Sequence, residues 1–184
     1  MATRIGNQTG VWLTWANGLT ALRLLLAAPS AWFAATSQWA WAALLLSAAI
    51  LTDLLDGPLA RRLRQTSALG GLLDHSTDAA FVTLLLLALS TLGYLPWLLP
   101  ALVAASFLQY VADSRALAGR MLRASWLGRC NGIAYFVLAA AVVYRNALGL
   151  AWPDDALLEA FAWLLVATTV ASMADRLRAW LGTE

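Results

Sequence analysis

Four aspartates stand within the segment 51–80, between two long apolar runs. Their spacing places them in pairs on the faces of two helices. The first face carries Asp53, Asp56, Gly57 and Ala60, at i, i+3, i+4 and i+7. The second face carries Gly70, Asp74 and Asp78, at i, i+4 and i+8. Because a short link makes the two helices antiparallel neighbours, we expect the four carboxylates to converge on one point.

Four ionised carboxylates share one point only if a cation neutralises them, since like charges oppose ionisation and burial adds to the cost. Oxygen ligands at this density suit Mg²⁺ or Mn²⁺ better than zinc. Gly57 and Gly70 leave space beside the acids, and Arg61 offers a planar fork that suits phosphate. The segment therefore predicts a site for a diphosphate-containing substrate. The alternative is that the aspartates cap helix ends and pair with Arg61, Arg62 and Arg64. The register of all four favours the metal site.

The chain that must position these aspartates is too apolar for a soluble domain. Of its 184 residues, 61% are hydrophobic and 12% are charged, and the mean hydropathy is +0.70. Soluble domains carry about a quarter charged residues. We therefore expect an all-α integral membrane protein with a single domain, 1–184, because in lipid a helix satisfies its own backbone polar groups. Six transmembrane helices are predicted, each near the ~20 residues that cross the hydrocarbon: 18–36, 39–61, 70–92, 96–114, 131–150 and 156–175.

Arginine, which supplies all twelve basic residues, predicts the orientation of these helices. It is concentrated in the N-terminal segment, in the links 61–69 and 114–130, and in the C-terminal tail, whereas the alternate links have only Arg145 nearby. By the positive-inside rule, both termini and the aspartate site are cytoplasmic. The stretch 11–20, with tryptophan beside polar residues, suggests a short N-terminal interfacial helix. We expect no cleaved signal peptide.

The aspartate segment resembles the signature of the CDP-alcohol phosphotransferase family at every fixed position. The matching pattern is Asp53-x2-Asp56-Gly57-x2-Ala60-Arg61-x8-Gly70-x3-Asp74-x3-Asp78. The stretch "NGLTALRLLLAAP" (17–29), with Asn17, Thr20 and Arg23, is similar to the family's first span, and "TVAS" (169–172) is similar to its last. The resemblance therefore covers most of the chain.

The resemblance implies a transferase of phospholipid biosynthesis, in which an alcohol displaces CMP from a CDP-linked donor, usually CDP-diacylglycerol. Two divalent metal ions, Mg²⁺ or Mn²⁺, would be held by Asp53, Asp56, Asp74 and Asp78, and Asp78 would also act as the catalytic base. The CDP pocket would be formed by Asp56, Gly57, Ala60, Arg61, Gly70 and Thr20. The expected partners are CDP-diacylglycerol, an alcohol, membrane lipid and a second copy of the chain, with no nucleic acid. The expected location is a bacterial inner membrane.

The acceptor alcohol is less sharply defined. In length the chain resembles phosphatidylglycerophosphate synthases, which favours glycerol 3-phosphate, but His75 and Ala79 stand where those enzymes usually have proline and lysine. Inositol phosphate and serine stay open as alternatives. Candidates for binding an anionic acceptor are Arg129, Arg120 and Arg115; alternatively these arginines only set the topology and touch lipid headgroups. His75 points about 100° away from the aspartates, so we interpret it as a neighbour of the site rather than a ligand.

Two functions of other classes fit parts of the pattern. A cation transporter or channel would use the acids for permeation, but all four lie at one depth and no relay of polar residues continues through the other leaflet. A catalytically silent membrane scaffold would not need the complete motif. Both considerations favour the transferase.

Overall fold

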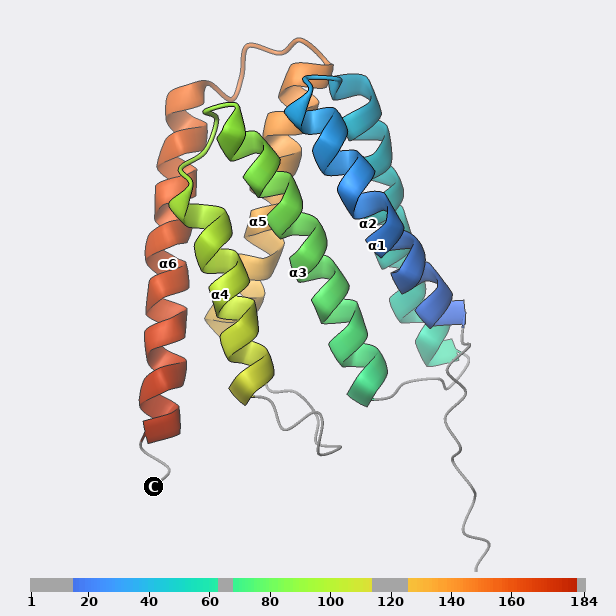
Figure 1. Cartoon of the computed structure of the whole chain (residues 1–184), viewed down its shortest axis with the longest axis vertical. Coiled ribbons are helices and arrows are strands. Elements are labelled where there is room, and N and C mark those ends of the chain that lie inside the picture. Colours follow the sequence, from blue (N-terminus) through green and yellow to red (C-terminus); the bar gives the residue numbers. More distant parts are fainter. Residues whose placement is uncertain (1–14, 63–67, 114–125, 182–184) are drawn as a thin grey trace, which may run out of the picture.

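The computed structural model describes residues 15–62, 68–113 and 126–181, and all regular structure within them is helical. The helices are α1 (Trp15–Ala35), α2 (Trp39–Arg62), α3 (Ala68–Thr91), α4 (Leu98–Asp113), α5 (Trp126–Ala147) and α6 (Asp155–Leu181). They form one bundle, coloured from blue to red along the chain in Figure 1. The predicted all-α fold is confirmed.

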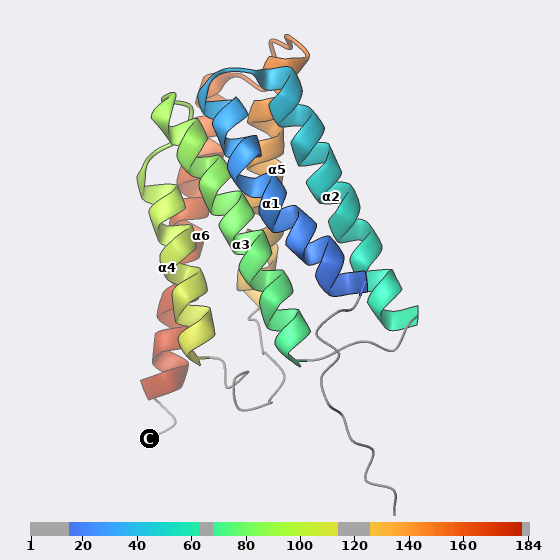
Figure 2. The same ribbon diagram turned by 45° about the vertical axis from the view of Figure 1, so that its right-hand side comes forward.

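Successive helices run in opposite directions, and α3 packs against α1, α4 and α5, as Figures 1 and 2 show. The turns that join α1 to α2, α3 to α4 and α5 to α6 all lie at one end of the bundle, at the top of Figure 1. The start of α1 and the end of α6 lie at the opposite end. That opposite end is also where α2 finishes and α3 begins, so it holds the aspartate segment.

Three of the helices have a buried stripe with helical spacing. On α1 the stripe is Thr20, Arg23, Ala27, Ser30 and Ala34. On α2 it is Ala42, Leu46 and Ala49, and on α6 it is Leu158, Ala162, Leu165, Thr169 and Ser172. Small residues dominate the α1 stripe, and they allow neighbouring helices in a membrane to approach closely. The polar residues of the site continue these apolar stripes toward the end of the bundle that holds the aspartates.

The end of the bundle opposite the aspartates is fastened by Arg145. Its guanidinium pairs with Asp155 at 2.6 Å, donates to the carbonyl of Pro153 at 3.0 Å and lies 5.4 Å from the ring centroid of Tyr94. The hydroxyl of Tyr94 in turn donates to Asn146 at 3.0 Å. These contacts tie the α3–α4 turn to the α5–α6 turn.

Three segments of the described residues are long and apolar enough to cross a membrane, judged by length and composition: Gly71–Thr91, Trp126–Ala147 and Asp155–Arg178. Three shorter apolar helical stretches accompany them: Thr20–Ala35, Trp39–Leu54 and Leu98–Ala112. Membrane crossing by all six helices therefore stays a prediction. The predicted N-terminal interfacial helix, 11–20, begins outside the described ranges, and its part from Trp15 onward belongs to α1.

Two helices extend beyond the membrane spans predicted for them. Helix α5 begins at Trp126 rather than at 131, so Arg129 belongs to its first turns. Helix α6 continues to Leu181, so Arg176 and Arg178 are also helical. The prediction followed the apolar part of each segment, but a helix can extend beyond the hydrocarbon when long basic side chains carry their charge toward water.

Candidate active site

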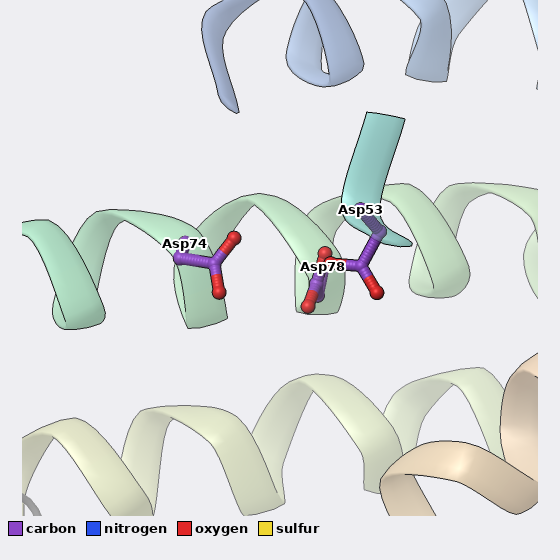
Figure 3. A group of neighbouring side chains, drawn as sticks. All are labelled: Asp53, Asp74 and Asp78. Atoms are coloured by element: carbon purple, nitrogen blue, oxygen red, sulfur yellow. The ribbon is translucent and has the colours of Figure 1, made fainter. Parts of the chain in front are cut away.

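Three of the four aspartates converge in the structure. Asp53, Asp74 and Asp78 each offer a carboxylate oxygen, and these oxygens lie within 4.8 Å of one another. Figure 3 shows Asp53 reaching from α2 toward Asp78, with Asp74 one turn away on α3. Asp53 continues the buried stripe of α2 one turn beyond Ala49. Helical spacing puts each acid on the inner face of its helix, and α1, which packs against both α2 and α3, brings the two faces together.

Several predicted site residues fall outside the described part of the structure. For the side chains at the end of α2 and the start of α3 only the helical backbone is described: Asp56, Gly57, Ala60, Arg61 and Gly70. Arg115 and Arg120 lie wholly outside the described ranges. Their roles stay predictions.

Arg23 occupies the centre of the acidic cluster. Its Nη2 lies 3.0 Å from Asp53 Oδ1 and its Nη1 lies 3.0 Å from Asp74 Oδ1. Nη1 also pairs with Asp78 Oδ1. The Arg23 side chain is 1% exposed, whereas the three acids are between 30% and 48% exposed. Thr20, assigned by resemblance to the CDP pocket, is buried on the same stripe of α1, one turn before Arg23.

A cavity of about 380 Å³ adjoins the cluster, and Asp53 and Asp78 are both part of its wall. Helices α3, α4, α5 and α6 supply the rest. The apolar wall residues are Ala79, Val82, Val103, Phe107, Ile133 and Phe136. Asp78 is thus shared by the acidic cluster and the cavity, so a group bound in the cavity can reach its carboxylate.

Two arginines line this cavity, Arg129 from α5 and Arg176 from α6. The Arg176 guanidinium lies over the ring of Tyr110, 5.2 Å from its centroid, and donates to the carbonyl of Ser106 at 3.4 Å. On α3, His75 stacks against the same Tyr110 at 5.6 Å. The wall therefore combines fixed positive charge with apolar surface, which suits a molecule that has both an anionic group and an apolar part.

Sequence reasoning missed the contributions of Arg176 and Tyr110. A usable signal existed for Arg176, because it follows Thr169 and Ser172 on the buried stripe of α6 at helical spacing. Tyr110 carries no comparable signal within its apolar helix. His75 fits its interpretation as a neighbour of the site, since it contacts Tyr110 and lines the cavity.

Beside the cavity, α5 and α6 are joined by a buried polar contact. The hydroxyls of Tyr135 and Thr169 lie 2.5 Å apart, and either can donate. When Thr169 gives its one proton to the carbonyl of Leu165, at 2.5 Å, Tyr135 is the donor between the two hydroxyls. Tyr135 lines the cavity, so this contact holds part of the wall in place.

A model of the CDP-alcohol phosphatidyltransferase family matches residues 13–173 of the chain. The chain belongs to this family. It is also similar to a protein of Streptomyces coelicolor named cardiolipin synthase (CMP-forming), with 43% identity over 65 residues. That match covers 35% of the chain and 30% of the relative, so the chain spans less than a third of the relative's length.

Membership of this family agrees with the membrane transferase of phospholipid biosynthesis that the sequence predicted. Family membership favours the predicted transferase over the two alternatives, a cation transporter and a catalytically silent scaffold. Members of this family use CDP-linked donors, alcohol acceptors and divalent metals. The residues present fit a divalent metal, because three hard carboxylate donors stand close enough to share an ion.

Proposed function

We propose that the protein transfers a phosphatidyl group from CDP-diacylglycerol to the hydroxyl of an anionic alcohol and releases CMP. The observation that carries this proposal is the convergence of Asp53, Asp74 and Asp78 beside a cavity that two arginines line. Membership of the CDP-alcohol phosphatidyltransferase family supplies the reaction class.

The acids hold the metal in this proposal. Asp53, Asp74 and Asp78 are its ligands, and Asp56, on the same face of α2, is the expected fourth. Bound Mg²⁺ or Mn²⁺, two ions by family resemblance, neutralises the donor diphosphate and the departing CMP. The nucleotide part of the donor lies against Thr20 and the predicted positions on α2 and α3: Gly57, Ala60, Arg61 and Gly70.

Asp78 is the general base. Its place in both the acidic cluster and the cavity wall supports this role, because the donor is proposed to bind at the acids and the acceptor in the cavity. The acceptor oxygen forms a bond to the phosphorus of the phosphatidyl group, and its proton passes to Asp78. The bond from that phosphorus to the bridging oxygen of the diphosphate breaks, and CMP leaves with this oxygen.

The cavity binds the acceptor. Arg129 and Arg176 meet its anionic group, because guanidinium suits phosphate oxygens. Most other wall residues are apolar, and one of them, Ile133, is 69% exposed at the surface of the chain. In a membrane that outer surface faces acyl chains. We therefore favour an anionic phospholipid with a free headgroup hydroxyl over the glycerol 3-phosphate expected from chain length. Similarity to a protein named cardiolipin synthase supports the same choice.

The membrane arrangement is part of the proposal. All six helices cross the bilayer, and the site faces the cytoplasm of a bacterial cell. The arginine distribution supports this orientation, and the three long apolar segments support insertion. A homodimer is proposed from the family resemblance alone.

One assay tests the reaction and names the acceptor. The purified chain in lipid nanodiscs is supplied with CDP-diacylglycerol and Mg²⁺ or Mn²⁺, and CMP release is measured with phosphatidylglycerol, glycerol 3-phosphate, inositol 1-phosphate or serine. We expect release with phosphatidylglycerol and none after chelation by EDTA. Release with glycerol 3-phosphate alone would keep the reaction class and exclude the lipid acceptor. No release with any alcohol would exclude the proposed function.

A further inference from the structure

The position of Arg23 raises a question that the transfer reaction does not answer. The residue lies in the middle of α1, its side chain is 1% exposed, and its guanidinium contacts Asp53, Asp74 and Asp78. We propose that Arg23 is an exchangeable internal counter-cation: it neutralises the acidic cluster when no metal is bound, and a divalent metal displaces it from the carboxylates. The inference rests on the metal-dependent function proposed above.

Without metal, Arg23 and the three aspartates balance each other's charge. Three partly buried carboxylates within 4.8 Å of one another repel strongly, and each resists ionisation unless a cation is near. The buried guanidinium of Arg23 in turn needs an anion close by, because an unpaired charge away from water is costly. The contacts between them resolve both problems, and they tie α1 to α2 and α3.

The Arg23 guanidinium and a divalent metal ion would bind the same carboxylate oxygens. Arg23 reaches Oδ1 of Asp53 and Oδ1 of Asp74 at 3.0 Å, and it also contacts Oδ1 of Asp78. These carboxylates are the ones a metal would need. Octahedral Mg²⁺ holds its oxygens at about 2.1 Å, so two of them stand at most ~4.2 Å apart. The three carboxylate oxygens lie within 4.8 Å of one another, so a small movement of their side chains brings them onto one ion once the guanidinium has left.

The guanidinium of Arg23 and a divalent metal ion cannot hold these carboxylates at the same time. A guanidinium and a divalent ion at about 4 Å repel each other, and this repulsion is weakly screened away from water. Metal binding therefore requires the head of Arg23 to leave the carboxylates. The displaced guanidinium needs another anion, and the diphosphate of the donor is the anion that this site receives. Arg23 would thus weaken metal binding and stabilise the enzyme while the site waits for metal.

Measurement of Mn²⁺ affinity tests the exchange. The full chain in nanodiscs is titrated with Mn²⁺, and free Mn²⁺ is followed by electron paramagnetic resonance for wild type, Arg23→Gln and Arg145→Gln. Arg145 is a suitable control because it is another poorly exposed arginine paired with an aspartate, at the opposite end of the bundle. We expect Arg23→Gln to bind Mn²⁺ about tenfold or more tightly than wild type, because a repelling charge is gone. Arg145→Gln should bind Mn²⁺ as wild type does.

Thermal unfolding provides an independent readout. In EDTA, Arg23→Gln should unfold at a lower temperature than wild type, and saturating Mn²⁺ should shrink the difference. A merely structural role for Arg23 would give the same difference with and without metal. Unchanged or weaker Mn²⁺ binding by Arg23→Gln would overturn the inference. Failure of wild type itself to bind Mn²⁺ would instead overturn the metal-dependent function, and the inference with it.

A measurement on the wild-type chain covers the case in which Arg23→Gln does not fold. The side-chain nitrogens of arginine are labelled with ¹⁵N, and the signal of Arg23 is assigned by its loss in Arg23→Lys. We expect Mg²⁺ to shift this signal while that of Arg145 stays in place. An Arg23 signal that does not move at saturating Mg²⁺ would show that the guanidinium keeps its carboxylate partners.

Discussion

Arg176 lies over the ring of Tyr110, with its Cζ 5.2 Å from the ring centroid. The contact joins the last turns of α6 to the last turn of α4 and presents a guanidinium to the cavity beside the acidic cluster. A cation over an aromatic face is held in place without losing its charge. This relationship supports the proposal that the anionic group of the acceptor binds at this side of the cavity.

Arg176→Gln should raise KM for the anionic acceptor. A charge-assisted hydrogen bond contributes about 1.5–3 kcal/mol, so the expected rise is about 10- to 150-fold. KM for CDP-diacylglycerol should change little, because the donor binds at the acids. Steady-state CMP release at varied concentrations of each substrate measures both constants. The control is Arg178→Gln, an exposed arginine of the same helix. An equal effect on both substrates would remove Arg176 from the acceptor site.

Asp78→Asn should lower the rate of CMP release by about 10²- to 10⁴-fold, the usual contribution of a positioned general base. The amide cannot accept the proton of the acceptor hydroxyl. Initial rates at saturating donor and acceptor give the measurement. Glu159→Gln removes an exposed carboxylate at the opposite end of the bundle and should leave the rate unchanged. If Asp78→Asn kept most of the wild-type rate, another group would have to be the base.

Ile133→Gln should lower the rate with a phospholipid acceptor severalfold and leave the rate with a small water-soluble acceptor unchanged. Ile133 lines the cavity and is 69% exposed, so the substitution alters the cavity opening with little effect on packing. Val137→Gln is the control, because Val137 lies one turn further along α5 and is exposed outside the described cavity wall. The same loss from both variants would point to a general effect on the lipid-facing surface.

Thr169→Val should lower the free energy of unfolding by about 0.6–1.7 kcal/mol, the range measured for buried hydrogen bonds between membrane helices. The substitution keeps the shape and removes the partner of the Tyr135 hydroxyl. Unfolding of the purified chain in mixed micelles, followed by tryptophan fluorescence, gives this value. Thr168→Val is the control, since Thr168 bonds only within its own helix among the described contacts. Equal free energies of unfolding for the two variants would show that the α5–α6 contact does not stabilise the fold.

The acidic cluster could be predicted because it depends on two simple quantities, helical periodicity and a short link. Periodicity puts Asp74 and Asp78 on one face of α3 and Asp53 on the inner face of α2, but the two faces meet through α1, which packs against both helices. The partner of Arg23 could not be predicted in this way. The sequence shows that Arg23 lies deep within α1. Which carboxylates its side chain reaches depends on how closely α1 approaches α2 and α3. The small residues of the α1 stripe set that distance.

Two other features needed the structure for different reasons. Hydropathy reports contact with lipid rather than helix length, so the start of α5 was placed too late and Arg129 was assigned to a link. Arg176 was taken only as a topology signal, because a charge near a helix end is ordinary in membrane proteins. Its place over Tyr110 depends on the packing of α6 against α4, which no local pattern records.

Helix α3 carries the acids and its part of the cavity wall on adjoining strips of its surface, with Asp78 belonging to both. Asp74 and Asp78 stand one turn apart, while His75, Ala79 and Val82 line the cavity from an adjacent strip of the same helix. Changes on that strip can therefore alter which alcohol fits while the spacing of the acids is preserved. A fold of this kind can diversify its products during evolution by exchanging a few residues of one helix, without rebuilding the chemistry.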